Sequence, residues 1–187
     1  MKILGLDLSL SSTGVAHVTT TPDGWQAETS RVVVKARHVP RGGEPHTLAE
    51  RSVRLRRLAG LITDHARGAD LVVVEGPSYA SDTGKAHDRA GLWWLVVGRL
   101  TGAGLQVVEV PPSTVKTYAT GKGNAGKDEV LAAVVRRYPT VEVRDNNEAD
   151  ALVLAALGAR FLRLPIEPDL PKTHLRALTG VRWTPTT

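Results

Sequence analysis

Short apolar runs separated by turn residues open the chain and predict strands. Residues 3–8 are apolar except for one aspartate and lead into a cluster of serine, threonine and glycine, which is typical of a buried strand. Residues 15–19 and 29–35 predict two further strands, with a Pro-Asp-Gly turn at 22–24 before the last of them. We expect these three strands to form an antiparallel meander.

Helical and strand-like patterns alternate along the rest of the chain. Residues 70–75 contain an apolar run, Leu-Val-Val-Val, that begins after an aspartate and ends in glutamate; because this run does not alternate, it predicts a strand buried on both faces. Residues 105–110 predict another strand, which Pro111-Pro112 should end. The order of elements predicts an α/β fold, in which a mixed five-stranded sheet carries helices on both faces. The predicted helices are residues 48–62, 86–100, 126–138 and 147–162.

The length of 187 residues predicts one folded domain with its own hydrophobic core. We expect this domain to span residues 1–162, followed by an extended, Pro-containing tail at 163–187. Cysteine is absent, which excludes disulfides, thiolate nucleophiles and cysteine-bound zinc. No apolar run approaches the eighteen or so residues of a membrane span, and no leader pattern precedes the first strand. We therefore expect a cytoplasmic protein with no membrane partner.

Basic residues are concentrated in one part of the chain. The formal charge is +5, and residues 31–67 contain nine Lys or Arg against three Asp or Glu. Arg51, Arg54 and Arg57 lie on the polar side of the predicted helix 48–62. This distribution favours a polyanionic partner, with these arginines contacting phosphates, although a solvated basic surface would have the same composition.

Three carboxylates interrupt otherwise apolar elements. Asp7 lies in the first strand, Glu75 ends the run of valines, and Asp150 lies in a helix that is apolar nearly all round. Each has an ordinary alternative, respectively a turn cap, a salt bridge to a basic helix, and a helix N-terminal acid. Three acids brought together on buried elements would repel one another unless a divalent cation neutralised them. All-oxygen ligands indicate Mg²⁺, with Mn²⁺ as a substitute.

Asn147 precedes Asp150 by three residues, so both side chains project from one face of the predicted helix. Its amide oxygen can bind a hard cation, though less strongly than a carboxylate does. The same oxygen would also suit a helix cap, since Asp145, Asn146 and Asn147 all favour a helix start. The sequence leaves both roles open.

Four sets of segments occur in a characteristic order along the chain. They are Gly5-Leu6-Asp7-Leu8-Ser9 with Thr13-Gly14, Val73-Val74-Glu75, residues 112–116 with 121–127, and Glu148-Ala149-Asp150-Ala151-Leu152. Together they resemble the RuvC-type Holliday junction resolvases, and the similarity runs from the first residue to about residue 160. The resemblance implies a ribonuclease-H-like fold, a homodimer, Mg²⁺ dependence, and paired nicking of four-way DNA junctions, with Asp7, Glu75 and Asp150 as metal ligands. One departure is that the family usually has an acid, or sometimes histidine, at the position of Asn147.

Lysines flank a glycine-rich stretch at residues 121–126. Lys116 and Lys127 would place cations where backbone can approach closely, which suits DNA phosphates or the charge of a transition state. Lys122 is also a candidate DNA contact, although a solvated loop residue is a fair alternative. The spacing does not fit a nucleotide-binding loop, because Asp128 follows the last lysine, and we expect no nucleotide cofactor.

Aromatic residues supply two further candidates. Tyr79 follows Glu75 in a loop of small and polar residues, where it could stack on an unpaired base or pack beneath the loop. Trp93 and Trp94 are adjacent, so they point to different faces of their helix. One of them can serve the core while the other reaches a subunit interface or DNA.

The function expected from these residues is hydrolysis of branched DNA. Three alternatives stay open: a nuclease acting on structured RNA, a junction-binding protein whose weakened site no longer cuts, and an actin-like or sugar-kinase ATPase. An actin-like or sugar-kinase ATPase normally has a chain about twice as long as one domain of this size.

Overall fold

A mixed sheet forms the centre of the protein. The computed structural model describes residues 1–77, 85–167 and 169–183. The strand order is β3-β2-β1-β4-β5, with β1, β2 and β3 antiparallel and with β4 and β5 parallel to β1. The predicted α/β fold with a mixed five-stranded sheet is therefore confirmed. The strands are β1 (Lys2–Asp7), β2 (Thr13–Thr21), β3 (Gly24–Val32), β4 (Leu71–Glu75) and β5 (Val107–Val110).

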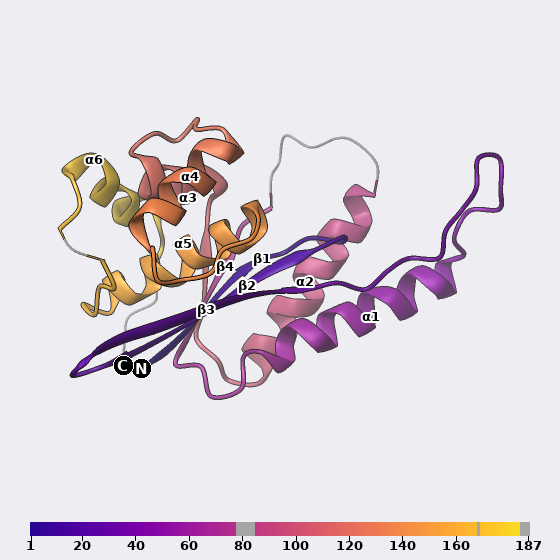
Figure 1. The fold of residues 1–187 in the computed structure, drawn as a ribbon. Coiled ribbons are helices and arrows are strands. Elements are labelled where there is room, and N and C mark those ends of the chain that lie inside the picture. The colour runs from indigo at the N-terminus through magenta and orange to yellow at the C-terminus, as the bar shows by residue number, and fades with distance from the viewer. Residues whose placement is uncertain (78–84, 168, 184–187) are drawn as a thin grey trace.

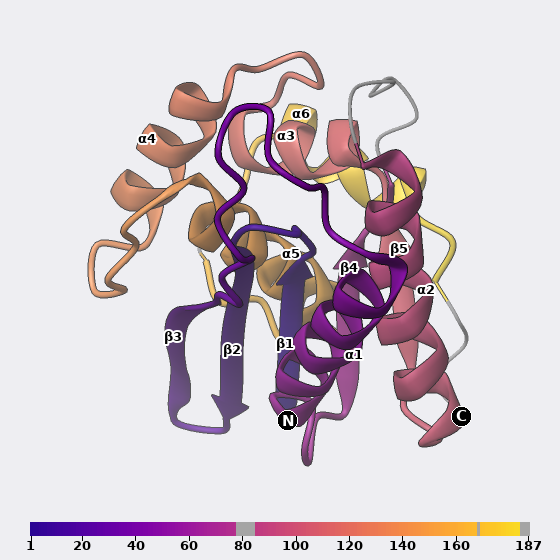
Figure 2. The same ribbon diagram turned by 90° about the vertical axis from the view of Figure 1, so that its right-hand side faces the viewer.

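Helices cover both faces of this sheet (Figure 1 and Figure 2). The helices α1 and α2 lie on one face, and α3, α4 and α5 lie on the other with the C-terminal segment. None of the helices in the described part of the chain is long and apolar enough to cross a bilayer. The helices are α1 (Leu48–Asp64), α2 (Ala86–Gly102), α3 (Pro112–Thr120), α4 (Lys127–Arg137), α5 (Asn146–Phe161), α6 (Lys172–Leu175) and the 3₁₀ helix η1 (Arg176–Gly180).

The hairpin of β2 and β3 differs from the expected third strand at 29–35. The strand β3 begins at Gly24 and ends at Val32, because a turn of only two residues, Pro22 and Asp23, joins it to β2. Its burial alternates weakly and it carries several polar residues, so its first half has no apolar run by which to recognise it.

Strand alternation decides which face each side chain occupies. Ile3 packs in the core on the α5 side, whereas Leu4 and Leu6 pack in the core beneath α1 and α2. Successive strand residues point to opposite faces, so Gly5 and Asp7 share the α5 side with Ile3. The same alternation in β4 puts Glu75 on the α5 side. Both acidic strand ends therefore face the helix that carries Asp150.

Glycines allow α5 to lie against β1 and β2 at close range. A Cβ atom at Gly5 would lie 2.1 Å from the Ala151 carbonyl oxygen and 2.7 Å from the Ala155 nitrogen. A Cβ at Gly14 would lie 1.9 Å from the carbonyl oxygen of Asn147. Only residues without a side chain fit these two contacts, and they bring the start of α5 to the end of β1.

Gly5→Ala should lower the free energy of unfolding by about 3 kcal/mol or more, because helix backbone cannot yield as a flexible side chain can. It should also impair any activity that needs Asp150, since α5 would move away from β1. Gly98→Ala is the matched control: nothing lies within 4 Å of its added Cβ, and its helix should gain about 0.5–1 kcal/mol. Urea unfolding of both variants tests this, and equal stability of Gly5→Ala and wild type would contradict the close packing.

The helix α3 is an element that the sequence pattern did not predict. The pair Pro111-Pro112 predicts only the end of a strand, but Pro112 is also the first residue of α3. Proline suits the first turn of a helix, where its missing N–H has no intrahelical partner. The buried residues Val115, Tyr118 and Ala119 follow helical spacing and are a signal that could have revealed this helix.

The C-terminal segment is folded onto the domain, which corrects the expectation of an extended tail from residue 163. It contains α6 and η1, and Ala177 and Val181 are buried in the core on the α5 side. The ring of Trp183 stacks on Phe161 with 4.2 Å between centroids. The domain boundary at residue 162 stays a prediction, but the segment that follows packs against the core.

A buried polar network also holds this segment. The carboxylate of Glu167 accepts hydrogen bonds from the hydroxyls of Tyr118 and Tyr138, the second at 3.0 Å. The Arg160 guanidinium lies 3.5 Å from the same carboxylate and donates to the Tyr118 hydroxyl at 2.9 Å. The network joins α3, α4 and α5 to the start of the C-terminal segment.

Candidate functional site

Two carboxylates end neighbouring parallel strands. Asp7 is the last residue of β1 and Glu75 is the last residue of β4, and Leu6 pairs with Val74 immediately before them. Their side chains share a hydrogen bond, and Asp7 is only 9% exposed. Asp150 lies near the start of α5 and interacts electrostatically with both. The structure thus brings the three predicted acids to one end of the sheet.

Burial raises the pKa of all three carboxyls when no cation is bound. Desolvation raises the pKa of Asp7 to about 6, although the hydrogen bond from Glu75 and the charge of Lys127 lower it. Desolvation, with the charges of Asp7 and Asp150, raises the pKa of Glu75 to about 9. The pKa of Asp150 rises to about 7 through desolvation and the charge of Asp7. Without a cation the clustered carboxylates carry negative charge that nothing fully balances. A proton on Glu75 removes part of that charge.

The donor chemistry of this cluster fits a hard divalent cation. Carboxylate oxygens are the ligands that Mg²⁺ and Mn²⁺ prefer, and a cation would replace the protons that burial retains. In the described part of the chain, however, no three His, Asp or Glu side chains are grouped closely enough to hold a metal ion as they stand. The assignment of Asp7, Glu75 and Asp150 as ligands stays a prediction, and it requires their side chains to close around the ion.

Asn147 does not cap α5. The N-cap is Asp145, whose side chain accepts a hydrogen bond from the Glu148 N–H at 3.0 Å. The amide nitrogen of Asn147 instead donates to the Ser12 carbonyl oxygen at 2.8 Å, which ties α5 to the β1–β2 loop. Asn147 is the second residue of α5, and Asp145 already fills the N-cap position. The cap alternative for Asn147 is wrong, and the ligand alternative stays a prediction.

Glu148 is a buried acid with a structural role. Its carboxylate accepts hydrogen bonds from the Thr29 hydroxyl at 3.0 Å and from the Arg144 N–H at 2.8 Å, and Arg31 lies 3.5 Å away. These partners face β3 and the loop before α5. The Glu148 carboxylate therefore holds α5 against β3 through these contacts. It does not replace Asn147 at the acidic cluster.

Two of the three predicted lysines accompany the acids. The charge of Lys127 lowers the pKa of Asp7, Glu75 and Asp150, and the charge of Lys116 lowers that of Asp150. Lys127 is exposed at the first position of α4, where the helix dipole disfavours a cation, and the nearby carboxylates offset this cost. Lys116 lies on α3. The structure therefore places a cationic group on α3 and another on α4 beside the carboxylates.

Lys122 is placed differently. Its ammonium group pairs with Glu129 at 3.2 Å, and both side chains are exposed. Gly121, which has a φ of +81° as the C-cap of α3, turns the chain into this loop. The predicted DNA contact of Lys122 stays a prediction.

Comparison with known proteins assigns the chain to a family. The crossover junction endodeoxyribonuclease RuvC of Synechococcus sp. (strain CC9311) is 32% identical over 162 residues, which are 84% of this chain and 98% of that protein. The RuvC of Zymomonas mobilis is 33% identical over 163 residues, 85% of this chain and 90% of its own. No family model matches the sequence. The chain belongs to the RuvC family.

Solved structures of the RuvC family share the fold. The Thermus thermophilus RuvC structure covers 91% of this chain and 100% of its own, with a TM-score of 0.65 and 22% sequence identity. T. thermophilus RuvC in complex with Holliday junction substrate aligns with a TM-score of 0.64 at 20% identity. These similarities confirm the RuvC-like, ribonuclease-H-like architecture expected from the sequence.

Two of the arginines predicted to contact DNA make internal contacts in this RuvC-family chain. Arg51 forms a salt bridge with Asp88 of α2 at 2.5 Å, and its Nε also donates to this carboxylate. Arg54 donates to the carbonyl oxygens of Leu10 and Val34. Arg57 is exposed. The DNA role of all three stays a prediction. The Arg51 side chain is still 43% exposed although it is paired, and Arg57 forms no ion pair within the described residues.

The aromatic candidates are resolved in part. Trp93 is half-buried and donates from Nε1 to the backbone oxygen of Glu75 at 2.9 Å, whereas Trp94 is 67% exposed. The sequence indicated that the two rings differ in role but not that Trp93 braces the end of β4. Tyr79 lies outside the described residues, so its predicted stacking on a base stays a prediction.

Asn147→Asp tests the ligand assignment in this RuvC-family chain. The carboxylate would face the Ser12 carbonyl oxygen without a proton to donate, so stability should fall by about 1–2 kcal/mol without metal. If residue 147 contacts the ion, the added charge should lower the Mg²⁺ concentration needed for half-maximal cleavage. Asn147→Ala loses the same hydrogen bond without gaining charge and is the control. Equal Mg²⁺ midpoints in the aspartate variant and wild type would exclude Asn147 as a ligand.

Proposed function

We propose that this chain is a Mg²⁺-dependent crossover junction endodeoxyribonuclease that resolves Holliday junctions and other branched DNA by paired symmetric nicks. The observation that carries the proposal is the cluster of Asp7, Glu75 and Asp150 at the carboxyl end of the sheet, with Lys116 and Lys127 beside it. The relatives that match most of the chain are named for this activity.

The acids and lysines would divide the chemistry between them. The three carboxylates would hold the metal, which when bound lowers the pKa of a water and offsets charge on the phosphate. Lys127 and Lys116 would hold a non-bridging phosphate oxygen and stabilise the negative charge that develops there. Attack of the water oxygen on phosphorus, in line with the breaking P–O3′ bond, would leave a 5′ phosphate and a 3′ hydroxyl.

Positioning in this site comes from the fold. Trp93 braces the backbone of Glu75 from the α2 side, and the amide of Asn147 ties the β1–β2 loop to α5. Gly5 lets α5 approach β1 closely enough for Asp150 to interact with Asp7. These contacts would hold the reactive groups on rigid elements, which favours a defined orientation of the phosphate.

A cleavage comparison tests the proposed activity. End-labelled four-way DNA, linear duplex DNA and structured RNA are each incubated with Mg²⁺ and with EDTA. We expect Mg²⁺-dependent nicks at symmetric positions in the four-way DNA and little cutting of the linear duplex. Preferential cutting of the RNA would favour an RNA-processing nuclease, and junction binding without cutting under any metal condition would favour an architectural protein.

We also infer that the chain acts as a homodimer in the cytoplasm. An isologous two-fold pair would place two sites on a near-symmetric junction, as two symmetric nicks require. The α1–α2 layer supports a partner copy, since Leu61 is 41% exposed and Trp94 is 67% exposed. Sedimentation equilibrium should give about twice the chain mass of 20.0 kDa, and a monomer that still makes paired nicks would contradict the inference.

A further inference from the structure

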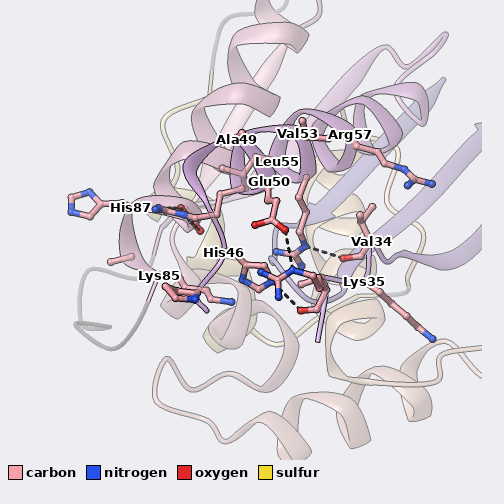
Figure 3. A pocket seen from close by; sticks show the side chains of 17 residues that line it. Val34, Lys35, His46, Ala49, Glu50, Val53, Leu55, Arg57, Lys85 and His87 are labelled. Carbon is pink, nitrogen blue, oxygen red and sulfur yellow. Dashed lines mark hydrogen bonds and ion pairs between the residues drawn. The ribbon is translucent and has the colours of Figure 1, made fainter. Parts of the chain in front are cut away.

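A cavity of about 780 Å³ opens between α1, α2 and the segment that joins β3 to α1 (Figure 3). Its volume lies within the range of roughly 300–1,000 Å³ that is usual for ligand pockets. Aliphatic side chains line much of the wall, among them Val34, Val53 and Leu55. The cavity is separate from the acidic cluster, because none of the three acids or the two lysines of that cluster lines it.

The charges around the cavity leave it positive. Six Lys or Arg line it against two acids, Glu50 and Asp88. Both acids are already paired: Glu50 accepts hydrogen bonds from Arg37 at 2.9 Å and from the Thr47 N–H at 2.8 Å, and Asp88 is paired with Arg51. The remaining cations are Lys35, Arg54, Arg57 and Lys85.

The exposed cations flank the cavity on two sides. Lys35 and Arg57 extend along one side, and Lys85 lies on the opposite side (Figure 3). Lys35 and Arg57 form no ion pair within the described part of the chain. Lys85 is the N-cap of α2 in the left-handed conformation, with a φ of 61°, and gives that helix no side-chain cap. The first turn of α2 therefore adds its positive dipole end to this side.

Arg51 and Arg54 shape the cavity and link it to the acidic cluster. The Arg51–Asp88 pair joins the first turn of α1 to the first turn of α2. Arg54 binds the carbonyl oxygens of Val34 and of Leu10, which is three residues after Asp7 in the β1–β2 loop. These two arginines are positioning residues, and their contacts place the cavity at the same end of the sheet as the carboxylates.

We propose that this cavity receives an unpaired nucleotide segment of the branched substrate, with a base against the aliphatic wall and phosphates at Lys35, Arg57 and Lys85. This inference rests on the proposed function. Single-stranded nucleic acid is bound by cations that follow the backbone together with surfaces that accept a base face, including guanidinium planes. A second copy of the chain is a poorer occupant, because a two-fold axis at this cavity would set its cations against one another.

Salt dependence of binding tests the phosphate contacts. The variant Lys35→Gln/Arg57→Gln/Lys85→Gln is compared with Arg56→Gln/Arg67→Gln/Lys172→Gln, which removes the same charge from exposed sites outside the cavity. Binding to a four-way junction is measured in EDTA at several salt concentrations. The cavity variant should lower the magnitude of the slope of log K against log salt by about 2, since each lost phosphate contact removes about 0.7–0.9. The control should change it by less than about 0.5.

A fluorescent base tests the apolar half of the proposal. A junction carrying 2-aminopurine at the branch point should change its fluorescence on binding wild type, and the cavity variant should lose most of that change. Val53→Asn should weaken binding about fivefold without altering the salt slope, because it removes apolar contact and no charge. Thermal melts of all variants show whether the fold is intact.

The outcomes separate this inference from the proposed function. Equal salt slopes for the cavity variant and its control, with wild-type junction binding intact, would overturn the nucleotide cavity alone. A wild type that neither binds nor cuts junctions would overturn the proposed function. If the cavity variant changes the sedimentation coefficient and leaves DNA binding unaltered, the cavity belongs to a contact between copies and the inference is wrong.

Discussion

Asp7→Asn, Glu75→Gln and Asp150→Asn should each reduce junction cleavage by about 10³-fold or more, because a lost metal ligand removes several kcal/mol of transition-state stabilisation. Binding should be unchanged or tighter, since removing negative charge cannot weaken attraction to phosphate. Burial already raises the pKa of all three carboxyls, so the neutral amides should fold at least as well as the wild type in EDTA. Single-turnover cleavage and junction binding in EDTA measure the two effects separately.

Glu148→Gln is the matched control for this series. It is a buried acid on the same helix, two residues before Asp150, but its carboxylate serves Thr29, Arg31 and Arg144. Its loss should lower stability, and the fraction that remains folded should cut at close to the wild-type rate. Near wild-type cleavage by any one of the three site variants would remove that residue from the catalytic cluster.

The stability of the metal-free protein should fall as the pH rises from about 5 to 9. All three cluster acids have a pKa above the unfolded value, so the folded state binds more protons across this range. Their stabilising contribution is complete below about pH 4 and is lost as the pH passes about 6 for Asp7, 7 for Asp150 and 9 for Glu75. For Asp150 the rise from 3.8 to about 7 corresponds to at most about 4 kcal/mol.

Mg²⁺ should reverse this loss, because the ion replaces the protons that leave. The melting temperature should rise more with Mg²⁺ at about pH 8 than at about pH 5.5, since cation and protons compete for the same oxygens. Asp150→Asn should flatten the pH profile in EDTA and lose most of the rise with Mg²⁺. Asp23→Asn, an exposed acid in the β2–β3 turn at the opposite end of the sheet, is the control and should behave as wild type.

Thermal melts across the pH range, with EDTA and with Mg²⁺, measure both effects. Stability that increases between about pH 5 and 9 in EDTA would show that the three carboxyls are not desolvated as a cluster. A rise with Mg²⁺ that is as large in Asp150→Asn as in wild type would place the ion elsewhere.

Apolar periodicity along the chain was sufficient to predict the fold class. Strands β1 and β4 are buried on both faces, so their apolar runs are continuous and stand out from the surrounding sequence. The strand β3 lies at the edge of the sheet with half of its residues polar, and its start was predicted five residues late. The sequence pattern does not predict the folded C-terminal segment, because its short helical turns draw their stability from contacts with α3, α4 and α5, which are distant in sequence.

The identity of the candidate site residues could also be predicted from sequence. Burying a charged residue in an apolar element costs free energy unless the charge is compensated. Asp7, Glu75 and Asp150 interrupt such elements, so the sequence alone identifies them as candidates. Lysines next to a glycine-rich stretch are candidates because they can place positive charge beside a phosphate. The arginines at 51, 54 and 57 share one helix face and one charge, so periodicity could not distinguish Arg51 and Arg54, which form internal contacts, from Arg57, which forms no ion pair in the described part of the chain.

The sequence by itself determined the sheet, the three acids and the family resemblance, because hydrophobic period and residue chemistry are local properties. Only the tertiary structure decided that Asn147 binds the Ser12 carbonyl rather than capping α5, and that Arg51 and Arg54 hold the elements around a positive cavity. Those roles depend on which atoms lie within about 3 Å after the chain has folded. The residues that make these contacts are up to 135 positions apart in the chain. A local sequence pattern cannot predict which of such distant residues come into contact.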